Sequence, residues 1–216
     1  KSIKYNNQAR DYQIEANDLC KNIPSPANSN DLKNFIMIVL LQGTKEGVEV
    51  AKLYRDEFKF RVDNKISGLP EEKYRLMWIQ NRIQFKTDIL NFLEENYGAN
   101  IVIDELNYIW WEPMDENDPL RSLAKRIITH PIVGPVDRRL EVITQLAQDY
   151  KIDGAVNPAH TGCRQSAGAR VLFKDALQKI GIPLIHLDVD CVDERNYAPG
   201  QIMTRMEAFL EMLSNY

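Results

Sequence analysis

The stretch NPAHTGCRQSAGA, residues 157–169, decides the fold that we predict for this chain. It follows a short apolar run, residues 153–156, that is typical of a buried strand, and it leads into a segment with helical spacing of apolar residues, 166–181. Cys163 is therefore expected in a strand-to-helix loop, at or just before a helix N-terminus. Free amides and the positive dipole end of a helix favour a thiolate there, and Arg164 would add to the effect. The alternative is an ordinary free cysteine.

Strand candidates and helical segments alternate on both sides of this stretch. Strands are predicted at residues 74–79, 100–104, 154–157 and 183–188, and helices at 85–97, 118–129, 135–149, 166–181 and 201–214. Strands separated by helices favour a parallel sheet with right-handed crossovers. We therefore predict an α/β fold, a flavodoxin-like (Rossmann-like) parallel sheet of about four strands flanked by helices.

A helical leader is expected before this lobe. Residues 1–22 have weak helical spacing, and a cluster of Pro, Ser and Asn breaks the pattern at 24–30. Helices are then predicted at 32–42, capped by Asn30 or Asp31, and at 45–62, capped by Thr44. Together these two helices form a predicted helical hairpin. The expected domains are residues 1–70, the leader and hairpin, and residues 71–216, the α/β lobe.

The composition argues against several classes of partner. A net charge of −4 and an isoelectric point near 5.5 give no electrostatic reason to expect nucleic acid or an anionic membrane. The longest apolar run has seven residues, 35–41, well short of the ~20 that span a bilayer. Three widely spaced cysteines make no disulfide framework, so a reduced, cytoplasmic location is expected.

Four loops are expected to meet at the carboxyl edge of the predicted sheet, beginning at Gln80, Glu105, Asn157 and Asp190. Trp110 and Trp111 lie in the second loop, where they could form an aromatic wall for a flat ligand or could anchor the loop in the core. Their neighbours at this edge are Asn81, Arg82, Asn107, His160, Cys163, Cys191, Asp193 and Arg195.

His160 could act as an acid or base or could pair with Cys163 for nucleophilic catalysis, although the sequence offers no third group to orient it. The acidic run 188–195 could hold a hard metal ion, or it could form ion pairs with Arg195 and Arg205. Cys20 and Cys191 are expected to be ordinary cysteines. An iron–sulfur cluster is normally held by about four thiolates, so an iron–sulfur cluster at Cys163 would need further ligands from elsewhere.

The last predicted helix carries an apolar stripe of Met203, Met206, Phe209, Leu210 and Leu213. This stripe is expected to pack on the sheet, with Met212 facing outward. A methionine-rich surface for a partner is the alternative.

Five segments together give the sequence a familiar pattern. They are residues 72–78 (EKYRLMW), 118–121 (DPLR), 153–154 leading to 162–165 (GCRQ), 187–190 leading to 193–195, and 200–211 (GQIMTRMEAFLE). With them the chain resembles the C-terminal half of subunits in the 2-hydroxyacyl-CoA dehydratase and benzoyl-CoA reductase family. The resemblance covers nearly all of residues 30–216.

The resemblance implies two similar lobes with a 4Fe-4S cluster between them. Cys163 matches the one metal ligand that comes from a C-terminal lobe, and the other two cysteine ligands would belong to an N-terminal lobe that this chain lacks. The chain alone is therefore expected to hold no stable cluster. The residues expected to contact the substrate are Trp110, Trp111, Arg164 and Gln165. Apolar surface is expected where the missing lobe belongs, along the edge bearing Trp110, Trp111 and Cys163.

The implied activity is that of a lyase that removes water from a 2-hydroxyacyl-CoA through a ketyl radical. The implied partners are an acyl-CoA substrate, a second homologous subunit and an ATP-dependent activator that supplies an electron. A benzoyl-CoA-reductase-like enzyme or another iron–sulfur reductase is an alternative. A further alternative is a non-catalytic subunit that only relays electrons.

Overall fold

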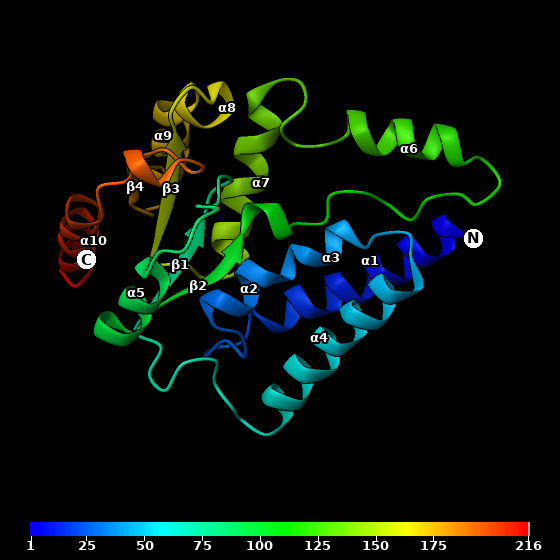
Figure 1. Ribbon diagram of the computed structural model, residues 1–216, viewed down its shortest axis with the longest axis horizontal. Helices are drawn as coiled ribbons and strands as arrows, with labels where there is room; N and C mark the ends of the chain where they lie inside the picture. Colours follow the sequence, from blue (N-terminus) through cyan, green and yellow to red (C-terminus); the bar gives the residue numbers. More distant parts are fainter. Residues whose placement is uncertain (216) are drawn as a thin grey trace.

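Four parallel strands form one sheet with the order β2-β1-β3-β4 in this computed structural model, which describes residues 1–215 (Figure 1). The strands are β1 (Tyr74–Trp78), β2 (Ala99–Asp104), β3 (Gly154–His160) and β4 (Leu184–Val189). The predicted flavodoxin-like α/β fold is thus confirmed. Because β2 and β3 lie on opposite sides of β1, the order reverses between β1 and β3, and open α/β sheets bind their ligands at such a switch point.

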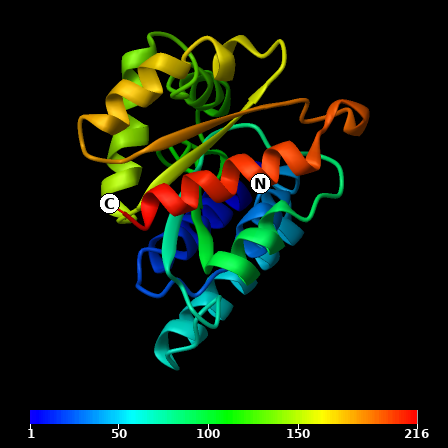
Figure 2. The same ribbon diagram turned by 90° about the vertical axis from the view of Figure 1, so that its left-hand side faces the viewer.

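Helices cover both faces of the sheet, which explains why β1, β2 and β3 are buried along nearly their whole length rather than at alternate residues. On one face, Met77 packs in a core with α7 (Val136–Asp149) and α9 (Arg170–Gln178). On the other face, Leu76 packs in a core with α5 (Ile89–Tyr97) and α10 (Pro199–Leu213). Figure 2 shows α10 crossing in front of the strands. Neighbouring residues of β1 therefore serve different cores, as the pleat of a strand requires.

The α10 stripe behaves as predicted. Met206, Phe209, Leu210 and Leu213 are buried against the sheet, and Met212 is exposed at the surface. At its N-terminus the helix begins at Pro199, two residues before the predicted start. Proline is well suited to the first turn of a helix because that turn needs no N–H donor.

The third strand is longer than the predicted 154–157, because β3 continues to His160. Proline within a run normally argues against a central strand, since it has no N–H to donate. Here β3 pairs with β1 only as far as Val156, and beyond that point it pairs with β4 alone. Pro158 therefore lies where β3 has no paired strand on its β1 side, so no N–H donor is needed there.

The leader contains α1 (Ser2–Leu19), α2 (Ser29–Phe35), α3 (Met37–Leu40) and α4 (Lys45–Asp63). Thr44 caps α4 as predicted, by accepting a hydrogen bond from the Gly47 N–H. The predicted cap of the preceding helix is wrong, because Asn28 fills that role in a reciprocal capping box with Asp31. The predicted hairpin is also corrected, since α4 packs mainly along α1 (Figure 1).

Residues from both sides of position 70 share one core. Ala9, Leu32 and Phe58 of the leader belong to the same buried cluster as Met77 and Ile103 of the sheet. The boundary at residue 70 remains a prediction, and Tyr216, the last residue of the predicted lobe, lies outside the described residues. Within residues 1–215, no helix is both long and apolar enough to cross a bilayer.

Between β2 and α7 the chain forms the short helix η1 (Glu105–Asn107) and then α6 (Pro119–Ile128). Figure 1 shows α6 standing apart from the rest of the fold. None of its residues is buried, and Leu120, Ile127 and Ile128 are exposed. A second short helix, η2 (Glu194–Asn196), follows β4.

Candidate functional site

Cys163 lies at the switch point of the sheet, in the loop that follows β3. Gly162 turns the chain with φ +82°, a conformation that glycine adopts freely, and Cys163 is then the N-cap residue of α8 (Arg164–Ala167). The predicted strand-to-helix position of Cys163 is confirmed. The predicted continuous helix over 166–181 is wrong, because the chain forms α8 and then α9 with a break at Gly168 and Ala169. Glycine is a poor helix former, and this accounts for the break.

The Cys163 thiol is half-buried, and its pKa is lowered. Partial burial raises this pKa, but hydrogen bonds from the Ser166 backbone and hydroxyl, the Gln165 backbone and the Asn81 side chain outweigh the burial. The Gln165 and Ser166 N–H groups are the free amides at the start of the helix, as predicted, whereas the dipole of a four-residue helix contributes little. The predicted support from Arg164 is not among the main causes, and Arg164 is exposed.

The other two thiols have the opposite character. Burial raises the pKa of Cys20 to about 12 and the pKa of Cys191 to about 12. Both side chains are buried, and the Cys20 thiol donates a hydrogen bond to the Ala16 carbonyl within α1. Both therefore behave as the ordinary cysteines predicted from the sequence, and Cys163 is the thiol at which chemistry can occur.

Two residues that the sequence did not single out as functional lie directly beside this loop. Gln80 follows β1 and is buried, and its side-chain nitrogen lies 3.9 Å from the Cys163 sulfur. Arg139 of α7 is also buried and donates to the Gln165 carbonyl oxygen at 2.8 Å. A buried arginine in a helix has no sequence pattern that would mark it in advance. Gln80 was visible only as the first residue of a predicted loop.

The hydrogen bond made by the His160 ring goes to a residue other than Cys163. Its Nδ1 accepts a hydrogen bond from the Cys191 N–H at 3.0 Å and lies 3.7 Å from the Asp190 carboxylate. The histidine therefore connects the end of β3 to the loop after β4, which favours a structural role over the acid–base alternative.

The acidic run 188–195 forms ion pairs. Arg195 pairs with Asp193, and Arg205 lies 3.7 Å from Asp188, as the ion-pair interpretation predicted. Two backbone N–H groups, of Val192 and Asp193, lower the pKa of Asp190 to about 2. Across residues 1–215 no group of three or more His, Cys, Asp or Glu side chains could hold a metal ion. The hard-metal interpretation is therefore not supported.

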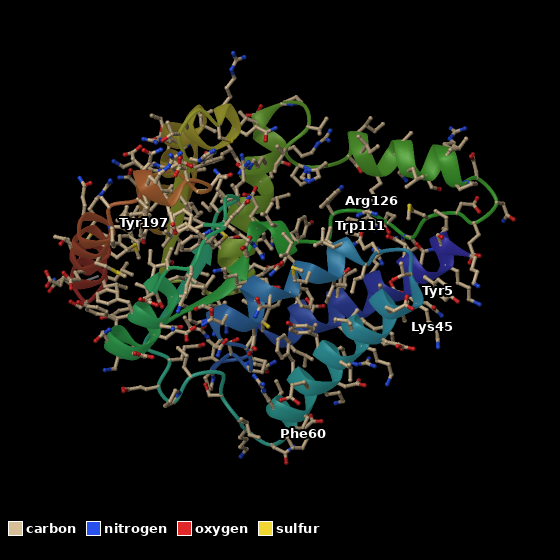
Figure 3. The ribbon with its side chains drawn as sticks, viewed as in Figure 1. Tyr5, Lys45, Phe60, Trp111, Arg126 and Tyr197 are labelled. Carbon is tan, nitrogen blue, oxygen red and sulfur yellow. The ribbon has the colours of Figure 1, made fainter. Side chains whose placement is uncertain are left out.

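Trp110 and Trp111 line a separate cavity of about 180 Å³ together with Arg126 and His130, and Cys163 is not among its described lining residues. Trp111 is only 4% exposed. Arg126 stacks 3.8 Å from the centre of the Trp111 ring, and Figure 3 shows the two side chains together beneath α6. The core-anchored interpretation therefore describes Trp111.

The leader covers the tryptophan part of the carboxyl edge. Arg10 of α1 donates to the Trp111 carbonyl oxygen at 2.6 Å, and Asn7 donates to the Met114 carbonyl oxygen at 2.8 Å. The expectation of open apolar surface is therefore wrong at Trp111. Arg164 and Gln165, in contrast, directly follow Cys163 in the sequence and are exposed.

The fold and the residues at the carboxyl edge of the sheet define a class of protein. Proteins of this class have a parallel α/β lobe in which a cysteine that favours the thiolate form lies at the switch point of the sheet. The model of the family described as 2-hydroxyglutaryl-CoA dehydratase, D-component, matches residues 1–213. The chain belongs to this family, in agreement with the resemblance seen in its sequence.

Several curated relatives match most of the chain. A benzoyl-CoA reductase subunit of Thauera aromatica is 25% identical over 98% of this chain and 52% of its own length. The alpha subunit of lactoyl-CoA dehydratase of Anaerotignum propionicum is 24% identical over 91% of this chain and 47% of its own. The alpha subunit of (R)-2-hydroxyisocaproyl-CoA dehydratase of Clostridioides difficile is 27% identical over 88% and 47%. The chain thus spans about half the length of these relatives.

Proposed function

We propose that this chain is one lobe of a subunit of an iron–sulfur 2-hydroxyacyl-CoA dehydratase, a lyase that removes water from a 2-hydroxyacyl-CoA by way of a ketyl radical. One observation carries the proposal. In a chain that belongs to this family, the thiol with the lowered pKa lies at the switch point of the sheet, where α/β folds bind ligands. The names of the relatives support the acyl-CoA class of substrate.

The donor set fits one ligand of a shared 4Fe-4S cluster rather than a whole cluster. Cys163 is a half-buried thiol with N–H donors around its sulfur, which is the environment that stabilises a metal-bound thiolate. Cys20 and Cys191 are buried with raised pKa values, so the remaining ligands would come from outside this chain. When bound, the cluster would supply low-potential one-electron chemistry.

The residues beside Cys163 would position the substrate. Arg164 and Gln165 are exposed on the same short helix and could contact the thioester group of an acyl-CoA. Trp110 and Trp111 are left out of this part of the proposal, because the structure gives them a different cavity. The proposed partners are a second homologous subunit and an ATP-dependent activator that delivers the electron.

Iron content tests the proposal. In the complete protein with its partner subunit, Cys163→Ala should lose iron, whereas Cys20→Ala and Cys191→Ala should keep it. The Cys20→Ala and Cys191→Ala variants are matched controls, because each of them lacks one thiol but keeps the proposed ligand. Equal iron in all three variants would show that Cys163 is not a ligand.

A reductase similar to benzoyl-CoA reductase is the second candidate, since one subunit of that enzyme matches 98% of this chain. A subunit that only relays electrons is the candidate from another class. A panel of acyl-CoA thioesters separates the three. Water loss from a 2-hydroxyacyl-CoA supports the dehydratase, and ring reduction supports the reductase. A spectrum of the cluster that does not change when any of the thioesters is added supports the subunit that only relays electrons.

A further inference from the structure

Gln80 has a backbone conformation that is unusual for its residue type. It lies two residues after the end of β1 with φ +60°, a left-handed conformation that L-residues other than glycine adopt at a cost in free energy. The side chain is only 8% exposed. Such a conformation persists where the surrounding structure holds the residue in place, and it is often found at functional sites.

Arg139 is the group that holds Gln80. Its guanidinium binds both carboxylate oxygens of Glu105, at 2.6 and 2.7 Å, and it stacks 4.5 Å from the centre of the Phe173 ring. The pair is buried, so its position is fixed by charge and by packing together. From this position Arg139 donates to the side-chain oxygen of Gln80 at 2.8 Å.

This hydrogen bond decides which way the Gln80 carboxamide points. An arginine can only donate, so the Gln80 oxygen must be the atom on the Arg139 side and the NH2 group must lie on the other. The NH2 nitrogen lies 3.9 Å from the Cys163 sulfur and 3.5 Å from the side-chain oxygen of Gln165. Its two hydrogens therefore have one acceptor each.

We propose that Gln80 is a positioning residue, fixed by the Arg139–Glu105 pair, whose NH2 group donates a hydrogen bond to the Cys163 sulfur and a second one to Gln165. The two donations hold the loop after β3 in register with the loop after β1, across the switch point of the sheet. The sulfur thereby gains a donor that favours its anionic form, whether as a free thiolate or as a metal ligand.

The inference adds a residue to the site of the proposed function, but its test needs neither a cluster nor a substrate. The measured quantity is the rate of Cys163 alkylation by iodoacetamide in the metal-free 216-residue chain at one fixed pH near 7. The alkylation rate reports on Cys163 alone, because Cys20 and Cys191 are buried. Peptide mapping assigns the labelled cysteine, and thermal melting shows that each variant is folded.

The central variant is Gln80→Met, which keeps the length of the side chain and removes its donors. We expect Cys163 to react about threefold to tenfold more slowly, the effect of losing one long hydrogen bond to the sulfur. The matched control is Gln84→Met, at an exposed position of the same loop, which should leave the rate unchanged. A Gln80→Met rate within twofold of the unsubstituted chain would overturn the proposal.

Two further variants separate the donor from other effects. Gln80→Glu keeps a partner for Arg139 but presents an oxygen to the sulfur, so it should slow alkylation more than Gln80→Met does. Gln80→Gly relieves the backbone strain and also lacks the donor, so it should react as slowly as Gln80→Met. A Gln80→Gly rate equal to that of the unsubstituted chain would refute the role of the carboxamide. Iron content tests the proposed function and the alkylation rate tests the role of Gln80. Either claim can therefore be refuted while the other stands.

Discussion

Arg75 and Glu72 form an ion pair that is almost wholly buried, with side-chain exposures of 6% and 2%. Every hydrogen-bonding group of the pair has a partner. Arg75 also donates to the backbone carbonyl oxygens of Cys20, Asn22 and Tyr150, and Glu72 accepts from the Asn100 side chain and the Ser25 N–H. The pair thus joins the leader to the first two strands of the sheet.

Removing one partner should destabilise the protein strongly. Arg75→Met leaves the Glu72 carboxylate buried without a cation, which typically costs about 3–5 kcal/mol of unfolding free energy. Urea denaturation measures this change. The control is Lys45→Met, which breaks the exposed pair with Glu49 near the start of α4 (Figure 3) and should leave stability unchanged. Similar stability of the two variants would contradict the importance of the buried pair.

Among the connections between elements, the contact of Gly68 with the leader is one of the tightest. The Gly68 N–H donates to the Ser25 carbonyl oxygen at 2.8 Å. A Cβ at this position would lie 2.3 Å from the Ala27 carbonyl carbon, which is backbone and cannot rotate away. The close approach brings the segment before β1 against the segment before α2.

Gly68→Ala should therefore separate these two segments and cost about 1–3 kcal/mol, as overpacking of a tight contact usually does. The matched control is Gly200→Ala at the start of α10, where a Cβ would meet nothing within 4 Å. That change should be neutral or stabilising by about 0.4–1 kcal/mol, because it reduces the entropy of the unfolded chain. Thermal melting of both variants measures the two changes in stability. Equal melting temperatures would rule out the predicted clash at Gly68.

The sequence predicted the order and type of the elements well, for a physical reason. Buried parallel strands are short apolar runs between helices, and both signals are local in the sequence, so all four strands were located. Two of the errors arose where distant contacts decide the outcome. Pairing with β4 extends β3 past Pro158, and packing on α1 gives α4 its main partner.

The candidate site was predicted in part. The position of Cys163 in its loop follows from a strand signal next to a helix signal, and that prediction is confirmed. The roles of Gln80 and Arg139 could not be predicted, because they depend on hydrogen bonds between residues 59 positions apart in the sequence. The place of Trp111 depends likewise on α1, whose Arg10 lies 101 positions away.

At the scale of the whole molecule, the shared core makes the leader part of the folded lobe. Leu32 and Phe58 pack in the same cluster as Met77 and Ile103, so removal of the leader would expose apolar surface of the sheet. We expect a fragment of residues 71–216 to lose cooperative unfolding in urea, and we expect the whole chain to unfold in one transition because both parts share a core. A fragment that unfolds cooperatively would instead establish residue 70 as a boundary between autonomous domains.

The contrast between one half-buried thiol and two buried ones has a practical consequence. The chain is in effect a single-cysteine protein under native conditions, so a maleimide-linked spin label or fluorophore should attach at Cys163 without prior replacement of Cys20 or Cys191. The label would sit at the switch point between β1 and β3. Distance measurements from it would then report how closely any neighbouring polypeptide approaches that edge in solution.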